Sequence, residues 1–374
     1  MRGRTGIIGS QAVPLPFISW SNNSPGAYEI GLSKSYILTV SSNPSNVTYS
    51  VSSGSLPSGM TLDPSYGEIY GIPTTSGQSY SYTITATNGF VSTSFSETGT
   101  VTAFSASGGT ESTSGGIKTH TFTGSGTFTV NSGLIPIEVL VAGGGGGGGG
   151  RHGGGGGAGG ISRHTSYALL VKGNYTISVG GLGGVSNPDP AYERGPGSAG
   201  GASYVYHPSL GTIFYAYGGG GGWSYSGSAG NGGSGGGGAG MAYMTGGTGI
   251  QSSSGIVPSG GSRVGLNGGS GSSATEGGGG GGLSTAGAAG STNGGSGGNG
   301  SSFGYIALGG GGGGGAQTTG GSGGTYGGGN GGSGGAAGSA ATIYAGGGGG
   351  SRSNPATNQA GVGYQGIVII RYAV

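Results

Sequence analysis

Uninterrupted runs of glycine constrain this chain more than any other feature. Eight consecutive glycines occupy positions 143–150, and shorter runs recur at 218–222, 309–315 and 346–350. All but 12 of the 109 glycines follow residue 105. Because glycine loses the most conformational entropy on folding, such a region folds only if other interactions offset that loss. A collagen-like fibre, an unstructured linker and a fold that needs glycine for close packing all fit this composition.

A repeated unit favours the third alternative. Each unit is a short apolar segment followed directly by a glycine run. The segments are 139–142, 213–217, 305–308 and 342–345. Collagen does not fit, because glycine does not recur at every third position and the chain has only 14 prolines. A linker stays the simplest alternative, but it would not place apolar segments in this phase.

We therefore predict that residues 117–374 form a domain of packed polyglycine II helices capped by short β-strands. This helix has three residues per turn and makes no internal hydrogen bonds, so its N–H and C=O groups must pair with neighbouring helices. Strands are expected at 119–123 and 127–130, joined as a hairpin, and at 137–142, 175–179 and 367–372. The predicted scaffold glycines are Gly143, Gly150, Gly218, Gly309, Gly315 and Gly346.

Residues 14–104 predict a different structure, a β-sandwich. Segments 36–40, 47–51, 80–86 and 91–95 are rich in β-branched and aromatic residues, and turn-forming residues separate them. Residues 1–13 are expected to form an extended attachment arm, with a frayed terminus as the alternative. The Gly/Ser/Thr-rich residues 105–116 are expected to form a flexible linker. The predicted fold class is thus mostly β plus polyglycine II.

The motifs LPSGMTLD (56–63), GEIYGIP (67–73) and YTITATN (82–88) resemble the immunoglobulin-like, cadherin-like domain family. The resemblance covers about ninety residues and implies an Ig-like spacer or presentation module. Cadherins bind calcium through clusters of acidic residues. The acidic residues of this segment are only Glu29, Asp63, Glu68 and Glu97, so we expect no calcium.

The motifs FTGSGTFTV (122–130), LVAGGGGGGGG (140–150) and GIVIIRY (366–372) resemble the glycine-rich domain of phage tail proteins. The region is also similar to the distal tail-fibre adhesins of T-even-type phages, in which loops between glycine helices bind host receptors. The resemblance implies a bacteriophage virion protein, exposed to the exterior, that binds a bacterial surface receptor. The Ig-like domain in front departs from those adhesins. Attachment to other virion proteins is therefore assigned to either the N-terminal arm or the Ig-like domain.

Large side chains between the glycine runs are the predicted receptor-binding residues. Short loops on a stiff scaffold form recognition surfaces at low entropic cost. The alternative is that these side chains only shield the glycine lattice from water. The predicted residues are Tyr192, Trp223, Tyr225, Tyr243, Met244 and Tyr326. Their receptor is expected to be a surface polysaccharide or an outer-membrane protein.

Composition argues against other functions. The net charge of +2 and the 5% of charged residues are too low for nucleic-acid binding. No apolar run is long enough for membrane insertion, and no cysteine is present. Paired carboxylates are scarce, so we expect no catalysis, no cofactor and no metal. A non-binding virion decoration protein and a capsule depolymerase remain alternatives to the adhesin.

Two further points stay open at this level. Arg151 and His152 at one end of a glycine run, with Arg163 and His164 at the other, suggest either a sugar-phosphate site or solvated caps; we favour caps. The oligomeric state is not defined, since tail fibres are often homotrimers and a polyglycine sandwich can be complete within one chain.

Overall fold

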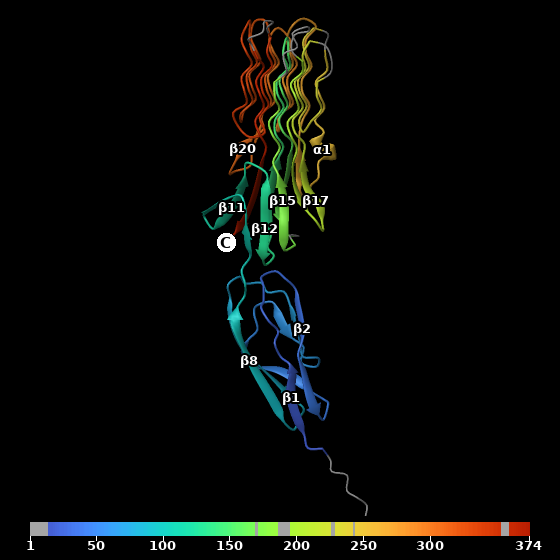
Figure 1. The fold of residues 1–374 in the computed structure, drawn as a ribbon, viewed down its shortest axis with the longest axis vertical. Coiled ribbons are helices and arrows are strands. Elements are labelled where there is room, and N and C mark those ends of the chain that lie inside the picture. The colour runs from blue at the N-terminus through green and yellow to red at the C-terminus, as the bar shows by residue number, and fades with distance from the viewer. Residues whose placement is uncertain (1–13, 169–170, 186–194, 226–228, 242–243, 353–358) are drawn as a thin grey trace, which may run out of the picture. The chain divides into compact units, whose positions relative to one another are not determined.

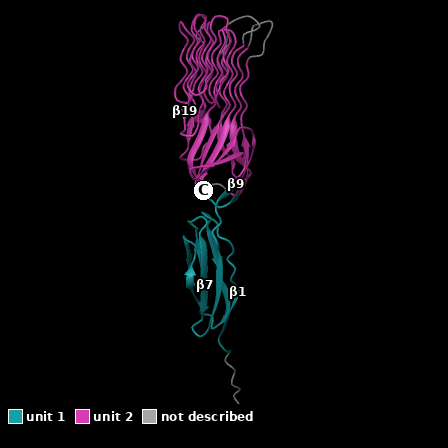
Figure 2. Ribbon diagram, turned by 90° about the vertical axis from the view of Figure 1, so that its left-hand side faces the viewer, with its two compact units in different colours: residues 1–105, 131–135 teal, residues 106–130, 136–374 magenta. Residues whose placement is uncertain are grey.

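The computed structural model describes residues 14–168, 171–185, 195–225, 229–241, 244–352 and 359–374 (Figure 1). The chain divides into two compact units (Figure 2). Unit 1 contains residues 1–105 and 131–135, and unit 2 contains residues 106–130 and 136–374. The predicted attachment arm, residues 1–13, lies outside the described residues. The fold is nearly all β, and the described residues include no helix long and apolar enough to cross a membrane.

Unit 1 is the predicted Ig-like β-sandwich. One sheet has the order β2 (Lys34–Ile37), β6 (Glu68–Gly71), β5 (Met60–Leu62), and another has the order β4 (Thr48–Ser55), β7 (Ser79–Thr87), β8 (Ser92–Thr100). A third pairs β1 (Phe17–Asn22) with β3 (Thr39–Asn43). Alternate residues of β7 are buried, and its Ile84 packs in one core with Leu38 and Ile69. This alternation confirms the strand with one buried face that the period-two pattern at 80–86 predicts.

Two larger sheets form the strand part of unit 2. The six-stranded sheet has the order β10 (Thr110–Ser114), β11 (Ile117–Phe122), β21 (Ile367–Ala373), β13 (Ile137–Ala142), β14 (Ile161–Tyr167), β18 (Ser262–Val264). The five-stranded sheet has the order β17 (Gly211–Ala216), β16 (Ser203–His207), β15 (Gly173–Ser178), β12 (Gly126–Ser132), β9 (Ser105–Ser107). A small hairpin pairs β19 (Ser301–Ser302) with β20 (Ala307–Leu308), and α1 (Gln251–Ser254) is a single helical turn.

Two sequence-based expectations about these strands are wrong. Segment 105–116 is not a flexible linker, because β9 pairs with β12 and β10 pairs residue by residue with β11. Its Ser and Thr residues tolerate a strand once neighbouring strands supply the hydrogen bonds. The expected hairpin of 119–123 with 127–130 also does not form. Instead β11 pairs with β10 and β21, whereas β12 pairs with β15, so the turn at 124–126 connects two different sheets.

Glycine-rich segments extend from these strands and reverse direction at the far side of unit 2 (Figures 1 and 2). We call the side with the β-strands the strand end and the side with the reversals the turn end. Segment 143–149 leaves β13 at the strand end, and segment 153–160 returns from the turn end into β14.

Segment 143–149 shows a three-residue repeat of hydrogen-bond partners. Gly143, Gly146 and Gly149 donate their N–H groups to carbonyls of segment 153–160, at 2.9–3.0 Å. Gly144 and Gly147 donate to segment 198–201, and Gly145 and Gly148 donate to segment 361–364. Each third residue therefore faces the same neighbour, which is the repeat of a polyproline-II-type helix. The polyglycine II assignment agrees with this repeat and stays a prediction.

Steric space explains why these positions are glycine. A Cβ atom built on Gly146 would lie 2.2 Å from the carbonyl oxygen of Gly220, and one on Gly145 would lie 1.9 Å from that of Gly346. Such distances are far below van der Waals contact, so a side chain would push the segments apart and break their hydrogen bonds. The hydrogen bonds between segments are the interactions that offset the entropy lost by ordering glycine.

Candidate functional site

Large side chains from separate turns lie at the turn end of unit 2. The turn-end patch consists of Arg151, His152, Trp223, Tyr225, Met241 and Met244. Main-chain hydrogen bonds join its turns: Tyr225 donates to the Arg151 carbonyl at 3.2 Å, and Gly240 donates to the His152 carbonyl at 2.9 Å. The Arg151 guanidinium lies 4.4 Å from the centroid of the Tyr225 ring. Tyr225 and Met241 are each 42% exposed.

Four residues of the turn-end patch have a left-handed backbone. The φ angles are 20° at Arg151, 54° at His152, 45° at Tyr225 and 88° at Met241. Such a conformation costs an L-residue about 1–2 kcal/mol. Glycine adopts it without that cost and is the most abundant residue of this unit. The patch therefore presents large side chains at positions where glycine would be less strained.

His152 is the central titratable group of the turn-end patch. Its ring is buried, and Nδ1 donates to the Thr275 carbonyl at 3.0 Å. Burial lowers the pKa of His152, and the positive charges of Arg352 and Arg151 lower it further, against the opposing effect of the Thr275 hydrogen bond. The imidazole is therefore neutral at neutral pH.

Glu276 is the acidic residue beside this histidine. Burial raises the pKa of its carboxyl, but hydrogen bonds from Thr275 and Ser272 outweigh burial and hold the pKa below its ordinary value. The Ser272 hydroxyl donates to Oε2 at 2.8 Å and the Thr275 hydroxyl donates to Oε1 at 2.6 Å. The carboxylate is thus ionised, and hydrogen bonds from its own turn stabilise the negative charge.

The structure separates the predicted receptor-binding residues. Trp223, Tyr225 and Met244 lie in the turn-end patch, with Trp223 and Met244 half-buried. Tyr326 does not belong to the patch: its carbonyl accepts from Gly310, two residues after the end of β20, which places it at the strand end. Tyr192 and Tyr243 lie outside the described residues.

The predicted receptor-binding set does not include Arg151, His152 and Met241, although the sequence suggests Arg151 and His152 as solvated caps or a sugar-phosphate site. Arg151 and His152 separate two glycine runs, and this position is the sequence signal that distinguishes them. Their expected counterparts behave differently. Arg163 is paired with Glu138, and His164 is hydrogen-bonded to the Ser259 carbonyl, both on β14 at the strand end.

Most of the predicted scaffold glycines lie within the lattice. A Cβ on Gly143 or Gly218 would lie 2.1 or 1.9 Å from a neighbouring carbonyl oxygen, and Gly315 and Gly346 are also enclosed by main-chain atoms. Gly150 is buried at the turn end. Gly309 differs from the others, because its φ is +79° and its missing side chain makes room for that of Leu283.

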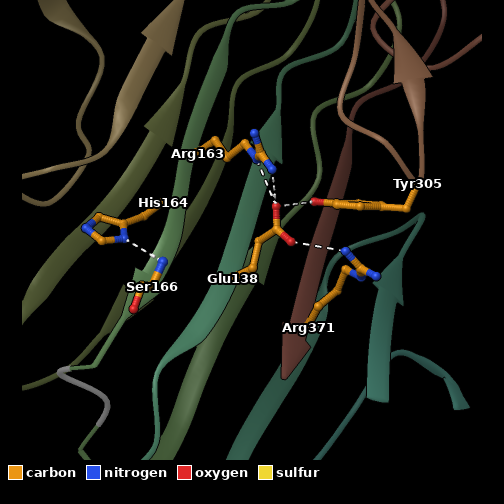
Figure 3. A network of polar contacts seen from close by, with 6 residues as sticks. All are labelled: Glu138, Arg163, His164, Ser166, Tyr305 and Arg371. Atoms are coloured by element: carbon orange, nitrogen blue, oxygen red, sulfur yellow. Dashed lines mark hydrogen bonds and ion pairs between the residues drawn. The ribbon is translucent and has the colours of Figure 1, made fainter. Parts of the chain in front are cut away.

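A second polar cluster lies at the strand end, centred on Glu138 (Figure 3). Arg163 donates through Nε to Oε1 at 2.8 Å, Arg371 donates to Oε2 at 3.1 Å, and the Tyr305 hydroxyl donates to Oε1 at 3.0 Å. The Arg371 guanidinium also lies 3.9 Å from the Tyr305 ring centroid. The cluster ties β13, β14 and β21 to the connection between β19 and β20, and we assign it a structural role.

In the part of the chain that the structure describes, no group of three or more histidine, aspartate or glutamate residues could hold a metal ion.

Comparison with known protein families matches both units. The family described as "Glycine-rich domain" matches residues 118–373, and the family described as "Putative Ig domain" matches residues 19–103. These matches confirm the predicted order of an Ig-like domain followed by a glycine-rich domain. No curated protein matches the chain.

Proposed function

The chain belongs to the glycine-rich domain family, and from this premise we propose that it is a bacteriophage tail-fibre or adhesin component that binds a host-cell surface receptor. A glycine-rich domain preceded by an Ig-like domain fits a phage tail or adhesin-type protein. The receptor is a surface polysaccharide or an outer-membrane protein. The binding residues are those of the turn-end patch.

The observation that carries this proposal is the left-handed backbone of four non-glycine residues in one patch. Backbone strain of this kind persists where surrounding structure imposes it, and it concentrates at functional sites. Covering the lattice against water would not require Arg151 and His152 in strained positions. Holding these side chains in a fixed position for a binding partner would explain the strained backbone.

The lattice supplies the rigidity that recognition needs. We propose that the glycine segments are polyglycine II helices, as the three-residue repeat of segment 143–149 supports. Turns held by such helices lose little entropy when they bind, because their side chains are already positioned.

The rest of the assignment follows from this role. We propose that the protein acts by binding rather than by catalysis, without cofactor or metal, and that it lies on the outside of the virion. Attachment to other virion proteins would use the Ig-like unit or the N-terminal arm, with no contact to nucleic acid or membrane interior.

Cell binding tests the proposal. Fluorescently labelled protein is added to a panel of bacterial strains with different surface polysaccharides and outer-membrane proteins. We expect retention on a subset of strains, and at least a tenfold loss of affinity, or about 1.4 kcal/mol, for the double variant Trp223→Ala, Tyr225→Ala. Retention on no strain would favour the decoration alternative. Unchanged binding by the double variant would contradict the assignment of the patch.

A further inference from the structure

The glycine content of each lattice segment follows the exposure of its residues. Segments 143–150, 277–282 and 346–350 are buried throughout and consist only of glycine. Segments 294–300 and 320–325 have two glycines in every three residues, and the remaining residue of each three is the exposed one. Those exposed positions carry serine, threonine or asparagine, never glycine.

Segment 285–290 has side chains on two of every three residues. Its glycines are Gly287 and Gly290, and its other four residues are exposed. A Cβ atom built on Gly287 would lie 2.0 Å from the Gly279 carbonyl oxygen, so this position faces the lattice. A segment thus has three, two or one glycine in every three residues, according to how many of its three directions face other segments.

The exposed side chains leave no room for a further segment at the lattice spacing. A Cβ on Gly321 or Gly324 would lie 2.1 or 1.8 Å from a carbonyl oxygen of segment 294–300, so these neighbours are too close for any side chain between them. On the exposed side of the same segment, Ser322 and Thr325 already carry a Cβ. Another glycine segment therefore could not approach that side as closely.

The side chains also accept hydrogen bonds that a neighbouring segment would otherwise accept. Within segment 143–149 every N–H group donates to a carbonyl of another segment. At the exposed Thr325 the N–H donates instead to Oδ1 of Asn299 at 3.1 Å, and the N–H of Asn299 donates to Oγ1 of Thr285 at 2.8 Å. Two further exposed N–H groups are bound in the same way, those of Asn330 (by Ser339 Oγ at 2.7 Å) and Thr248 (by Asn231 Oδ1 at 2.8 Å).

From these two observations we infer that exposed serine, threonine and asparagine side chains close the glycine lattice against the lattice of a second copy of this chain. A bare exposed glycine segment would present free N–H and C=O groups at the lattice spacing, as an open edge strand presents them to another strand. A second copy is the partner that fits, because it carries segments of the same spacing. The inference goes beyond receptor binding and does not depend on it.

One face suits a direct test. Segments 294–300 and 320–325 lie side by side, and the Ser322 hydroxyl donates to Oγ of Ser296 at 3.2 Å. We call their exposed side chains the capped face, which consists of Ser296, Asn299, Ser322 and Thr325. The glycine variant replaces all four with glycine, and the alanine variant replaces the same four with alanine.

Sedimentation velocity on the full chain at several protein concentrations compares wild type with the two variants. We expect the glycine variant to form an additional, larger species, with an association constant about tenfold or more above that of wild type. The alanine variant is the matched control, because it loses the same polar atoms but keeps a Cβ at each position. Its species distribution should equal that of wild type.

Hydrogen exchange shows whether the association uses the capped face. Concentrating the glycine variant should slow amide exchange in segments 294–300 and 320–325, while exchange in segment 143–149 stays as slow as in wild type. Added glycine favours the unfolded chain, so the glycine variant should unfold at a lower temperature. If it does not fold, the double variant Ser322→Gly, Thr325→Gly carries the same expectations with half of the substitutions.

Three results would overturn the inference. The first is a folded glycine variant, fourfold or double, that associates no more than wild type. The second is equal association of the alanine variant, since the Cβ atoms would then not be what keeps copies apart. The third is association that slows exchange only outside segments 294–300 and 320–325, which would place the contact on another surface.

Discussion

Tyr225 and Arg151 hold each other in place at the turn end, although 73 residues separate them. The Tyr225 N–H donates to the Arg151 carbonyl, and the Arg151 guanidinium lies 4.4 Å from the Tyr225 ring centroid. Both residues have positive φ. Two separate turns of the glycine lattice thus contribute to one surface.

Replacing Tyr225 with glycine should separate binding from stability. Relief of the left-handed strain offsets the lost ring contacts, so we expect the free energy of unfolding to change by about 1 kcal/mol or less. Cell binding should fall at least tenfold. Tyr326→Gly is the control, because Tyr326 has a φ of 60° and is 41% exposed but lies at the strand end. It should keep full binding, and equal losses in the two variants would contradict the placement of the site.

A single methyl group inside the lattice should be strongly destabilising. In Gly146→Ala the new Cβ would lie 2.2 Å from the Gly220 carbonyl oxygen, so segments must move apart. We expect a loss of about 3 kcal/mol or more in thermal or denaturant unfolding, with faster amide exchange across 143–149. Gly181→Ala is the matched control, because a Cβ there meets nothing within 4 Å. Its stability should stay within about 1 kcal/mol of wild type; equal effects would argue against a close-packed lattice.

Removal of the Glu138 carboxylate should destabilise the strand end. Glu138→Ala leaves Arg163, Arg371 and the Tyr305 hydroxyl without their shared acceptor. The cluster is partly exposed, so we expect a loss of about 2–3 kcal/mol, below that of a fully buried pair. Chemical denaturation measures this change, and cell binding at the opposite end should persist at permissive temperature. Glu111→Gln, which breaks an exposed pair with Lys118, should cause a clearly smaller loss.

Acid should destabilise unit 2 through His120. This ring is fully buried between Gly108 and Tyr372, and burial lowers its pKa against the opposing effects of the Gly108 hydrogen bond and Glu111. The unfolded state therefore binds a proton at higher pH than the folded state does. Stability should be independent of this group above about pH 6.5 and fall as the pH drops toward the folded pKa, by at most about 1.4 kcal/mol per pH unit.

Denaturant unfolding across the range from pH 8 to pH 4.5 measures this slope. The variant His120→Gln should be less stable at neutral pH and show a shallower decline below pH 6.5. His152, whose pKa is also lowered, contributes in the same direction, so His152→Gln should remove a separate part of the slope. A slope that neither substitution changes would exclude these two histidines as its source.

The sequence by itself determined what depends on local pattern. The glycine runs that directly follow apolar segments predict ordered packing, because an unstructured linker would not require an apolar segment before each glycine run. The alternation at 80–86 predicts a strand with one buried face, as Tyr82 and Ile84 show. The order of an Ig-like domain and a glycine-rich domain was likewise readable from motifs.

Only the tertiary structure decided which distant segments meet. In the folded protein, β11 and β12 belong to different sheets, and parts of segment 105–116 form strands. Trp223 and Tyr326 lie at opposite ends of unit 2. The physical reason is that a glycine segment such as 143–149 makes its hydrogen bonds with other segments, so its direction and register depend on partners far away in the chain. The turn-end patch exists because those partners bring separate turns to one surface, which no local pattern encodes.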